Sequence, residues 1–159
     1  MKRAFTILAA LFLPAFLHAQ TSIDLGGLTA DPSAAVEVTA DSLSVDQDSA
    51  TAVFAGNVKI GQGDLRLQAA RVEVVYAGET GDIARLLASG GVTFAPATEA
   101  AEAADANYDL QNGTLVLSGS VLLTQGASAL TADRMEVDLQ NGRAVMSGQV
   151  RTIFAQDGN

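Results

Sequence analysis

The side chains that carry out most protein chemistry are scarce in this sequence. It has no cysteine, and its one histidine, His18, lies in the N-terminal leader described below. Thiol nucleophiles, disulfides, histidine-based triads and ordinary zinc sites therefore lack their residues. Acidic residues are plentiful, but none of their pairs is flanked by an apolar run that would raise a carboxyl pKa for general acid catalysis. We expect no enzyme, no catalytic residue, no metal site and no cofactor.

Three short motifs resemble binding sites without completing one. The Asp-Gln-Asp sequence at 46–48 looks like the start of a calcium loop, but the glycine and late glutamate of an EF-hand are not at their spacing. We interpret it as a hairpin turn. The Gly-Gln-Gly sequence at 61–63 lacks the lysine of a phosphate-binding loop. The glycosylation sequon at 112–114 occupies a turn that recurs without threonine at 141–143, so turn chemistry explains it.

The first nineteen residues are typical of a secretory signal peptide. Two basic residues precede an apolar stretch from Ala4 to Leu17, and we predict cleavage after Ala19. The stretch is shorter than the roughly 20 residues that span a bilayer, and Pro14 interrupts it. The exported chain, residues 20–159, then has seven basic and eighteen acidic residues, a formal net charge of −11. Such a surface repels phosphate backbones, which argues against nucleic-acid binding.

A short pattern of a small residue, glycine, any residue and valine occurs four times along the chain. Its glycines are Gly56, Gly90, Gly119 and Gly148. A strand motif precedes each glycine: Ala-Asp-x-Leu/Met-x-Val-Asp occurs at 40–46 and 132–138, with variants at 70–74 and 104–109. Apolar and polar residues alternate in these segments, which predicts half-buried strands. The Asn-Gly pairs at 112–113 and 141–142 predict hairpin turns of type I′.

The apolar alternation changes phase by one residue in three strands, beside Ala40, Ala69 and Ala132. A β-bulge has this effect and bends a strand, so one interpretation is a corner in a long strand of a rolled sheet. The other interpretation is a pair of separate short strands at each place. A glycine inside the return strands marks a bend, a bulge or a close backbone approach.

The remaining segments set the predicted domain boundaries. Residues 20–35 are predicted to be a flexible lead-in, residues 36–155 one β-domain, and residues 156–159 a polar tail. The alanine-rich segment at 96–104 is predicted to be an irregular strand rather than a helical turn, and residues 76–83 a long connection. The chain is thus predicted to be all-β, an antiparallel sheet of four hairpin repeats rolled around one apolar face.

The predicted inward face is the candidate functional site. Its interior is either an ordinary filled core or a groove that holds apolar chains, and the pattern alone does not distinguish them. The candidate residues share an apolar side chain on the inward parity of a predicted strand: Leu43, Val45, Phe54, Val58, Ile60, Val72, Val74, Val92, Phe94, Tyr108, Leu115, Leu117, Val121, Leu123, Met135, Val137, Met146 and Val150.

The repeated motif, with the Ala/Ser-Gly-x-Val pattern after each turn and a signal peptide before them, resembles the LptA/OstA family of periplasmic lipopolysaccharide-transport bridge proteins. The resemblance covers about residues 36–155. It implies an OstA-like β-jellyroll, open at both ends, whose apolar groove receives the acyl chains of lipid A in the periplasm of a Gram-negative cell. It also implies head-to-tail self-association and docking, through end strands, to an inner-membrane transport complex and an outer-membrane translocon during outer-membrane biogenesis.

Two further hypotheses compete with a lipopolysaccharide carrier. One is a structural β-repeat protein that polymerises end to end as a periplasmic scaffold without lipid cargo. The other, an acid-catalysed hydrolase, needs a buried carboxylate pair that the sequence does not offer. Arg66, Arg71 and Arg134 are candidate contacts for phosphorylated headgroups. The sequence does not determine the lipid form, its affinity, or the number of copies and the polarity of a bridge.

Overall fold

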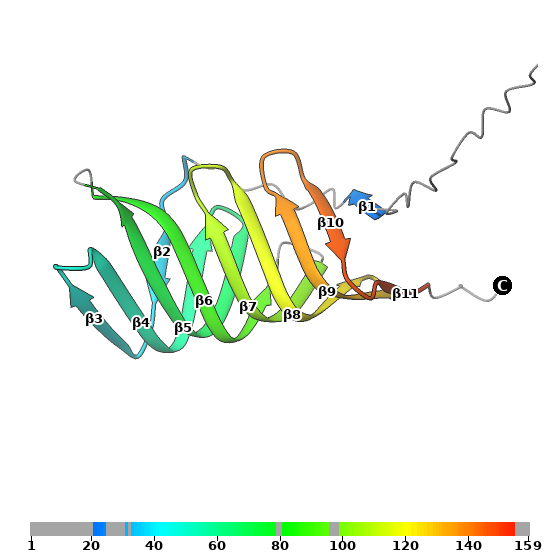
Figure 1. Cartoon of the computed structure of the whole chain (residues 1–159), viewed down its shortest axis with the longest axis horizontal. Coiled ribbons are helices and arrows are strands. Elements are labelled where there is room, and N and C mark those ends of the chain that lie inside the picture. Colours follow the sequence, from blue (N-terminus) through cyan, green and yellow to red (C-terminus); the bar gives the residue numbers. More distant parts are fainter. Residues whose placement is uncertain (1–20, 25–30, 32, 79–80, 96–98, 155–159) are drawn as a thin grey trace, which may run out of the picture.

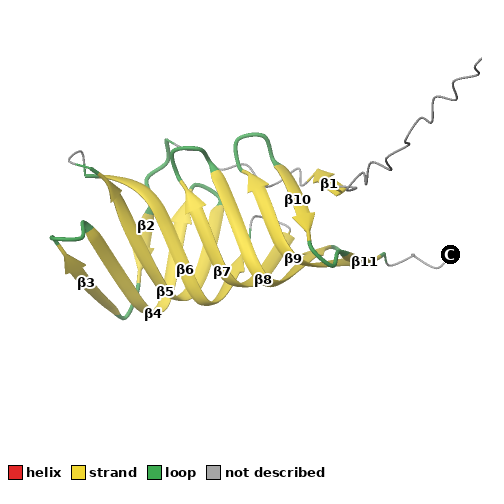
Figure 2. Cartoon of the chain, in the orientation of Figure 1, coloured by secondary structure: helices red, strands yellow, loops and turns green. Residues whose placement is uncertain are grey.

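The computed structural model describes residues 21–24, 31, 33–78, 81–95 and 99–154, so the predicted signal peptide and the polar tail lie outside the described residues. The described chain forms one eleven-stranded antiparallel sheet (Figures 1 and 2). No helix in this part of the chain is long and apolar enough to cross a membrane. The strands are β1 (Thr21–Asp24), β2 (Glu37–Thr39), β3 (Ser42–Asp46), β4 (Thr51–Gln62), β5 (Leu65–Ala77), β6 (Asp82–Phe94), β7 (Glu99–Asp109), β8 (Thr114–Gln125), β9 (Ser128–Asp138), β10 (Arg143–Ser147) and β11 (Arg151–Ile153).

Neighbours in sequence pair with one another along most of the sheet. The strand order is β1-β10-β9-β8-β7-β6-β5-β4-β2, with β3 also paired to β4 and β11 also paired to β9. Short hairpin loops join the long strands, so the sheet grows as a meander. Figure 1 shows each long strand bending about halfway along its length, so the whole sheet is folded over on itself.

The fold line divides the sheet into two leaves. Leaf A contains β1, β3, β10, the first halves of β4, β6 and β8, and the second halves of β5, β7 and β9. Leaf B contains β2, β11 and the other halves of β4 to β9. We call the fold line the corner, and the side where the hairpin loops lie the rim. Apolar side chains alternate along each strand and point between the leaves, where they form one buried core.

The corner is made by an extra residue in every second strand. Between Ala55 and Val58 on β4 lie two residues, but only Ala70 lies between their partners on β5. The same mismatch occurs in β6 and β8 against their neighbours. An extra residue on one strand is a β-bulge, and bulges at one level in successive strands bend the sheet along a line.

The bulges of β4, β6 and β8 contain Gly56, Gly90 and Gly119, and Gly148 lies at the same level in the connection between β10 and β11. All four glycines have a positive φ. Gly119 shows why the residue is glycine. Its φ is +81°, and a Cβ atom there would lie 2.7 Å from the Cβ of Ala104 on the neighbouring strand. An L-residue would be strained and would also collide. The prediction of a bend or bulge at the recurring glycine is confirmed.

Both interpretations of the phase change occur in the structure. The chain breaks into two strands, β2 and β3, on either side of Ala40. It runs on as a single strand through Ala69 in β5 and through Ala132 in β9. The all-β, rolled and open sheet is confirmed. The division into four hairpin repeats stays a prediction, because the strands form one continuous sheet.

Two expectations about turns and connections need correction. The Asn-Gly turns are not of type I′, because Gly113 and Gly142 have positive φ but Asn112 and Asn141 are not among the residues that do. Each turn is a four-residue loop in which the preceding aspartate accepts the asparagine N–H. The predicted connection at 76–83 is shorter, because β5 and β6 remain paired up to Ala77 and Asp82.

The alanine-rich segment is a strand, as predicted, from Glu99 onward, with residues 96–98 outside the described part. The segment predicted as a flexible lead-in contains β1, which pairs with β10 at the far end of leaf A.

Candidate functional site

Most of the predicted inward residues meet in the core between the leaves. Fourteen of the eighteen are buried: Val58, Ile60, Val72, Val74, Val92, Phe94, Tyr108, Leu115, Leu117, Val121, Leu123, Met135, Val137 and Met146. Phe54 is partly buried and packs against this cluster. Leu115, Leu117, Met135 and Val137 are 0% exposed, so side chains of the two leaves fill the space between them at the middle of the molecule.

The other three predicted residues are exposed and lie near the ends of the sheet. Leu43 and Val45 on β3 are 56% and 63% exposed, and Val150, just before β11, is 42% exposed. Ile153 and Phe154, which the sequence analysis did not select, follow Val150 in the chain and are 56% and 75% exposed. The large exposed apolar side chains of the described residues therefore all lie on β3 or around β11, at the two ends of the fold. Exposed apolar side chains that lie together, rather than singly, often mark a site of interaction with another molecule.

Several inward residues were missed, although their signal was available. Leu65, Leu67, Leu86, Leu130 and Leu139 are all buried in the core. Leu65 and Leu67 alternate with polar residues on one parity, as do Leu130 and Ala132. These residues precede the phase change of their strands. The candidate residues were taken only from the part after it, so alternation along the whole strand would have found them.

One polar contact joins the two leaves across the rim. Tyr108 on leaf A donates its hydroxyl to Oε1 of Gln62 on leaf B, at 2.7 Å, and Gln62 donates to the carbonyl of Ala34 at 3.2 Å. Burial raises the pKa of the Tyr108 phenol, which keeps the donor proton in place. Gln62 is 2% exposed, so this bond is buried. β7 lies three places from β4 in the sheet order. A strand of leaf A therefore faces a different strand of leaf B, rather than its own other half.

A cavity of about 320 Å³ lies beside this contact. Val36 and Gln62 line it from leaf B, and Ile83 and Leu110 from leaf A. It is thus a gap at the rim between the leaves, lined by both apolar and polar side chains. We call the hydrogen bond between Tyr108 and Gln62 at its edge the latch.

Glu99, at the rim end of β7, is the one buried acid of the described core. It is 9% exposed, and its Oε1 accepts a 2.9 Å hydrogen bond from Gln125 Nε2. Its Oε2 is buried without a hydrogen-bond partner among the described residues. The inner face of β7 beyond it carries alanines at 101, 103 and 106 before Tyr108, so this stretch brings little side-chain bulk into the interior. One carboxyl does not make the pair that a hydrolase needs.

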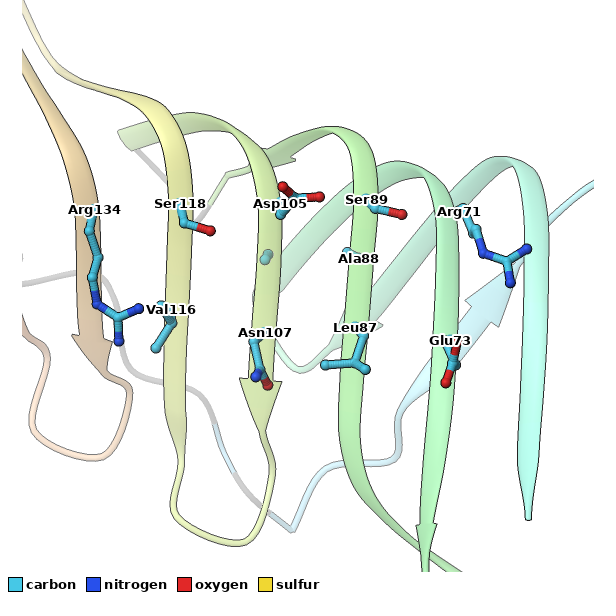
Figure 3. A pocket seen from close by; sticks show the side chains of 11 residues that line it. Arg71, Glu73, Leu87, Ala88, Ser89, Asp105, Asn107, Val116, Ser118 and Arg134 are labelled. Carbon is cyan, nitrogen blue, oxygen red and sulfur yellow. The ribbon is translucent and has the colours of Figure 1, made fainter. Parts of the chain in front are cut away.

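The outer face of leaf A carries a separate, polar hollow of about 410 Å³ (Figure 3). Arg71 and Glu73 lie at one side, Arg134 at the other, and Asp105 and Ser118 between them. Acids and bases are mixed here, and Arg134 is paired with Glu136 at 3.1 Å. The two arginines considered for headgroups therefore face away from the apolar core. The third, Arg66, donates to the carbonyls of its own hairpin.

The motifs that resembled ligand sites are turns. Asp46 accepts hydrogen bonds from the backbone N–H of Asp48 and Ser49, at 2.9 and 3.2 Å, and so closes the β3–β4 loop. Residues 61–63 end β4 and begin the loop to β5. Within the described ranges, no group of three potential metal-ligating side chains is present.

The geometry of the described residues thus defines a class of protein: a rolled β-jellyroll, open at both ends, with an apolar interior. Residues 37–153 match the model of the family described as "LptA/(LptD N-terminal domain) LPS transport protein", and the chain belongs to this family. The resemblance seen in the repeated motif is confirmed. The family is one of transport proteins, in agreement with the expectation that the chain is not an enzyme.

Two known proteins extend the comparison. An uncharacterized protein of Rhizobium meliloti (strain 1021) is 30% identical over 116 residues, which cover 69% of this chain and 62% of that protein. The chain thus spans less than two thirds of that relative's length. The crystal structure of LptH from Pseudomonas aeruginosa, described as the LptA-homologous periplasmic component of the lipopolysaccharide transport device, superposes with a TM-score of 0.70. It shares 16% identity, over 80% of this chain and 99% of LptH, and supports the fold.

Proposed function

We propose that this chain is a periplasmic lipopolysaccharide-transport protein that covers the acyl chains of lipid A with the inner face of its folded sheet. The observation that carries the proposal is an apolar interior in a sheet that is rolled without closing, within a family of lipopolysaccharide transport proteins.

The energetics favour such a cargo if the leaves separate. Each buried methylene contributes about 0.8 kcal/mol, so ten methylenes supply roughly 8 kcal/mol before association costs. The core between the leaves is filled by side chains, so an entering acyl chain displaces contacts between the leaves. The rim is the natural place for separation, because each hairpin loop there joins strand halves of the same leaf. The latch, rather than strand pairing, links the two leaves at this edge.

The ends of the sheet support the second part of the proposal, a bridge between the membranes. In the described chain β3 pairs only with β4, and β11 pairs only with β9, so each has an unpaired edge. Unpaired edges beside exposed apolar residues accept strands from other chains. We propose that these edges dock the inner-membrane complex, the outer-membrane translocon and further copies of the chain, head to tail.

A photo-crosslinking amino acid at Phe54 tests the lipid cargo. Phe54 is a partly buried residue of the inner face, and its neighbour Val53 has the opposite parity on the same strand. We expect the residue-54 variant to capture lipopolysaccharide in cells and the residue-53 variant to capture none. Equal capture at both positions, or capture at neither, would show that the inner face does not carry lipid.

A scaffold without cargo is the second candidate, and the filled interior is the observation that favours it. Here the leaves stay together and the open edges serve polymerisation alone. Detergent-free purification followed by mass spectrometry separates the two candidates. Bound lipid supports the carrier. A lipid-free chain, with lipopolysaccharide transport intact after depletion, supports the scaffold.

A further inference from the structure

The two ends of leaf A are not equivalent, because β1 covers one of them. β1 lies in the first residues of the predicted exported chain, yet it pairs along β10 at the far end of the sheet (Figure 1). The register joins Thr21 to Met146 and Asp24 to Arg143. At the other end of leaf A, β3 has no second neighbour among the described strands.

β1 matches β3 in sequence. The end of β1 reads Ser-Ile-Asp at 22–24, and the end of β3 reads Ser-Val-Asp at 44–46. In both strands the apolar residue is registered with an alanine: Ile23 with Ala144, and Val45 with Ala52. Both strands end at an aspartate at the rim.

β1 also matches β3 in direction. β3 runs from the corner to the rim, and β10 runs from the rim to the corner. β1 is antiparallel to β10, so it runs from the corner to the rim, as β3 does. A β3 strand from a second copy, placed beside β10 in antiparallel pairing, would therefore occupy the position and direction that β1 has in the structure.

The burial of the two ends agrees with this comparison. On β10, at the end that β1 covers, Ala144 and Met146 are 0% and 1% exposed. On β3, Leu43 and Val45 are more than half exposed. At the β10 end of leaf A, β1 of the same chain pairs with the edge strand. At the β3 end, the edge is unpaired among the described strands and exposes apolar residues.

We propose that β1 is an internal competitor for the end-to-end contact between copies of this chain: it pairs with β10 in cis and is displaced when β3 of a second copy pairs there in trans. This inference rests on the head-to-tail association in the proposed function and adds its regulation. A tethered strand acts at an effective concentration in the millimolar range, so micromolar free chain stays capped. A high local concentration of copies, or their alignment on a membrane complex, favours replacement of β1 by β3 of a second copy.

Prolines in β1 test the competition. Successive N–H groups of a strand point to opposite sides, so one of Ser22 and Ile23 directs its N–H toward β10, and the double variant Ser22→Pro/Ile23→Pro removes it whichever it is. We expect self-association, measured by analytical ultracentrifugation of the chain from Gln20, to tighten at least tenfold. The control Ser22→Thr/Ile23→Val keeps a strand-forming sequence and should associate as the wild type does.

A third change identifies the strand that replaces β1. Adding Val45→Asp, at an exposed position of β3, to the proline variant should abolish the gain. A peptide of residues 40–46 should bind the proline variant and not the wild type, which gives a readout independent of self-association. Circular dichroism checks that each variant is folded.

The outcomes separate this inference from the proposed function. Equal, measurable association of the wild type and the proline variant would leave head-to-tail association standing and overturn the competition. A monomeric state of both chains at all concentrations would overturn the competition and the proposed association together. Lipid capture at Phe54 reports on the cargo in either case.

Discussion

At the scale of single residues, the glycines of the corner decide whether the sheet folds over. Their neighbours differ along the corner. Gly90 and Gly119 face alanines at 70 and 104, whereas Gly56 and Gly148 face Asp41 and Asp133. Where the neighbour is aspartate, its side chain accepts a hydrogen bond from the residue after the glycine: Asn57 at 2.7 Å in the first case, Gln149 at 3.4 Å in the second. The aspartate of the repeated Ala-Asp motif thus stabilises the corner through a hydrogen bond and is not a catalytic acid.

The substitution Gly119→Ala should destabilise the fold by roughly 2–4 kcal/mol, because it adds a positive-φ penalty and a collision with Ala104. Denaturant unfolding measures the effect. Gly126→Ala is the matched control: its φ is +57°, but a Cβ there meets nothing within 4 Å, so only about 1 kcal/mol should be lost. Removing the Cβ of the neighbour in Ala104→Gly/Gly119→Ala should restore part of the loss. Equal costs at positions 119 and 126 would disprove the collision.

At the scale of elements, aspartates close the β7–β8 and β9–β10 hairpin loops. Asp109 accepts hydrogen bonds from the backbone N–H and the side-chain amide of Asn112, at 3.0 and 2.9 Å. Asp138 accepts the same pair from Asn141. For Asp109 the backbone bond, and for Asp138 the side-chain bond, is the main cause of a pKa below the usual aspartate value. The identical Asp-Leu-Gln-Asn-Gly sequences therefore encode identical loops.

These loops predict a sensitivity to acid with a definite sign. A folded-state pKa below the unfolded one stabilises the fold above about pH 4, and the benefit disappears as the pH falls through the folded pKa. The double variant Asp109→Asn/Asp138→Asn should melt below the wild type at pH 7, and the gap between the two should narrow as the pH falls through the folded-state pKa. Thermal melts from neutral to acidic pH measure this. Glu102→Gln, an exposed acid on the outer face of β7, is the control. A gap that stays constant down to the most acidic pH would show that these carboxylates do not stabilise the loops.

At the scale of the whole molecule, the two leaves are joined by the corner, by the core and by the latch at the rim. The latch is the buried bond between Tyr108 and Gln62, which are 46 residues apart. It lies where the leaves would have to separate for a lipid to enter. Its strength therefore bears on both stability and uptake.

The substitution Tyr108→Phe should lower the free energy of unfolding by roughly 1–3 kcal/mol, because buried Oε1 of Gln62 loses its donor. Backbone hydrogen exchange should also become faster near Gln62 at the end of β4 and near Tyr108 at the end of β7. The exchange rates at the corner should change later. Tyr76→Phe is the control, since the Tyr76 hydroxyl has no hydrogen bond to the described residues. If the two variants unfold alike, the latch does not hold the leaves together.

The sequence by itself determined most of the strands and their inward faces, and it indicated a bend or bulge at the recurring glycine. Alternation and the glycine spacing are local patterns, and fourteen of the eighteen residues they selected are buried between the leaves. Only the tertiary structure decided how the leaves meet, that Gln62 reaches Tyr108, that Leu43 and Val45 stay exposed, and that β1 caps β10. Each of these depends on pairing between segments far apart in the chain, or on the offset between leaves. A strand pattern specifies which face is apolar, but it does not specify what covers that face.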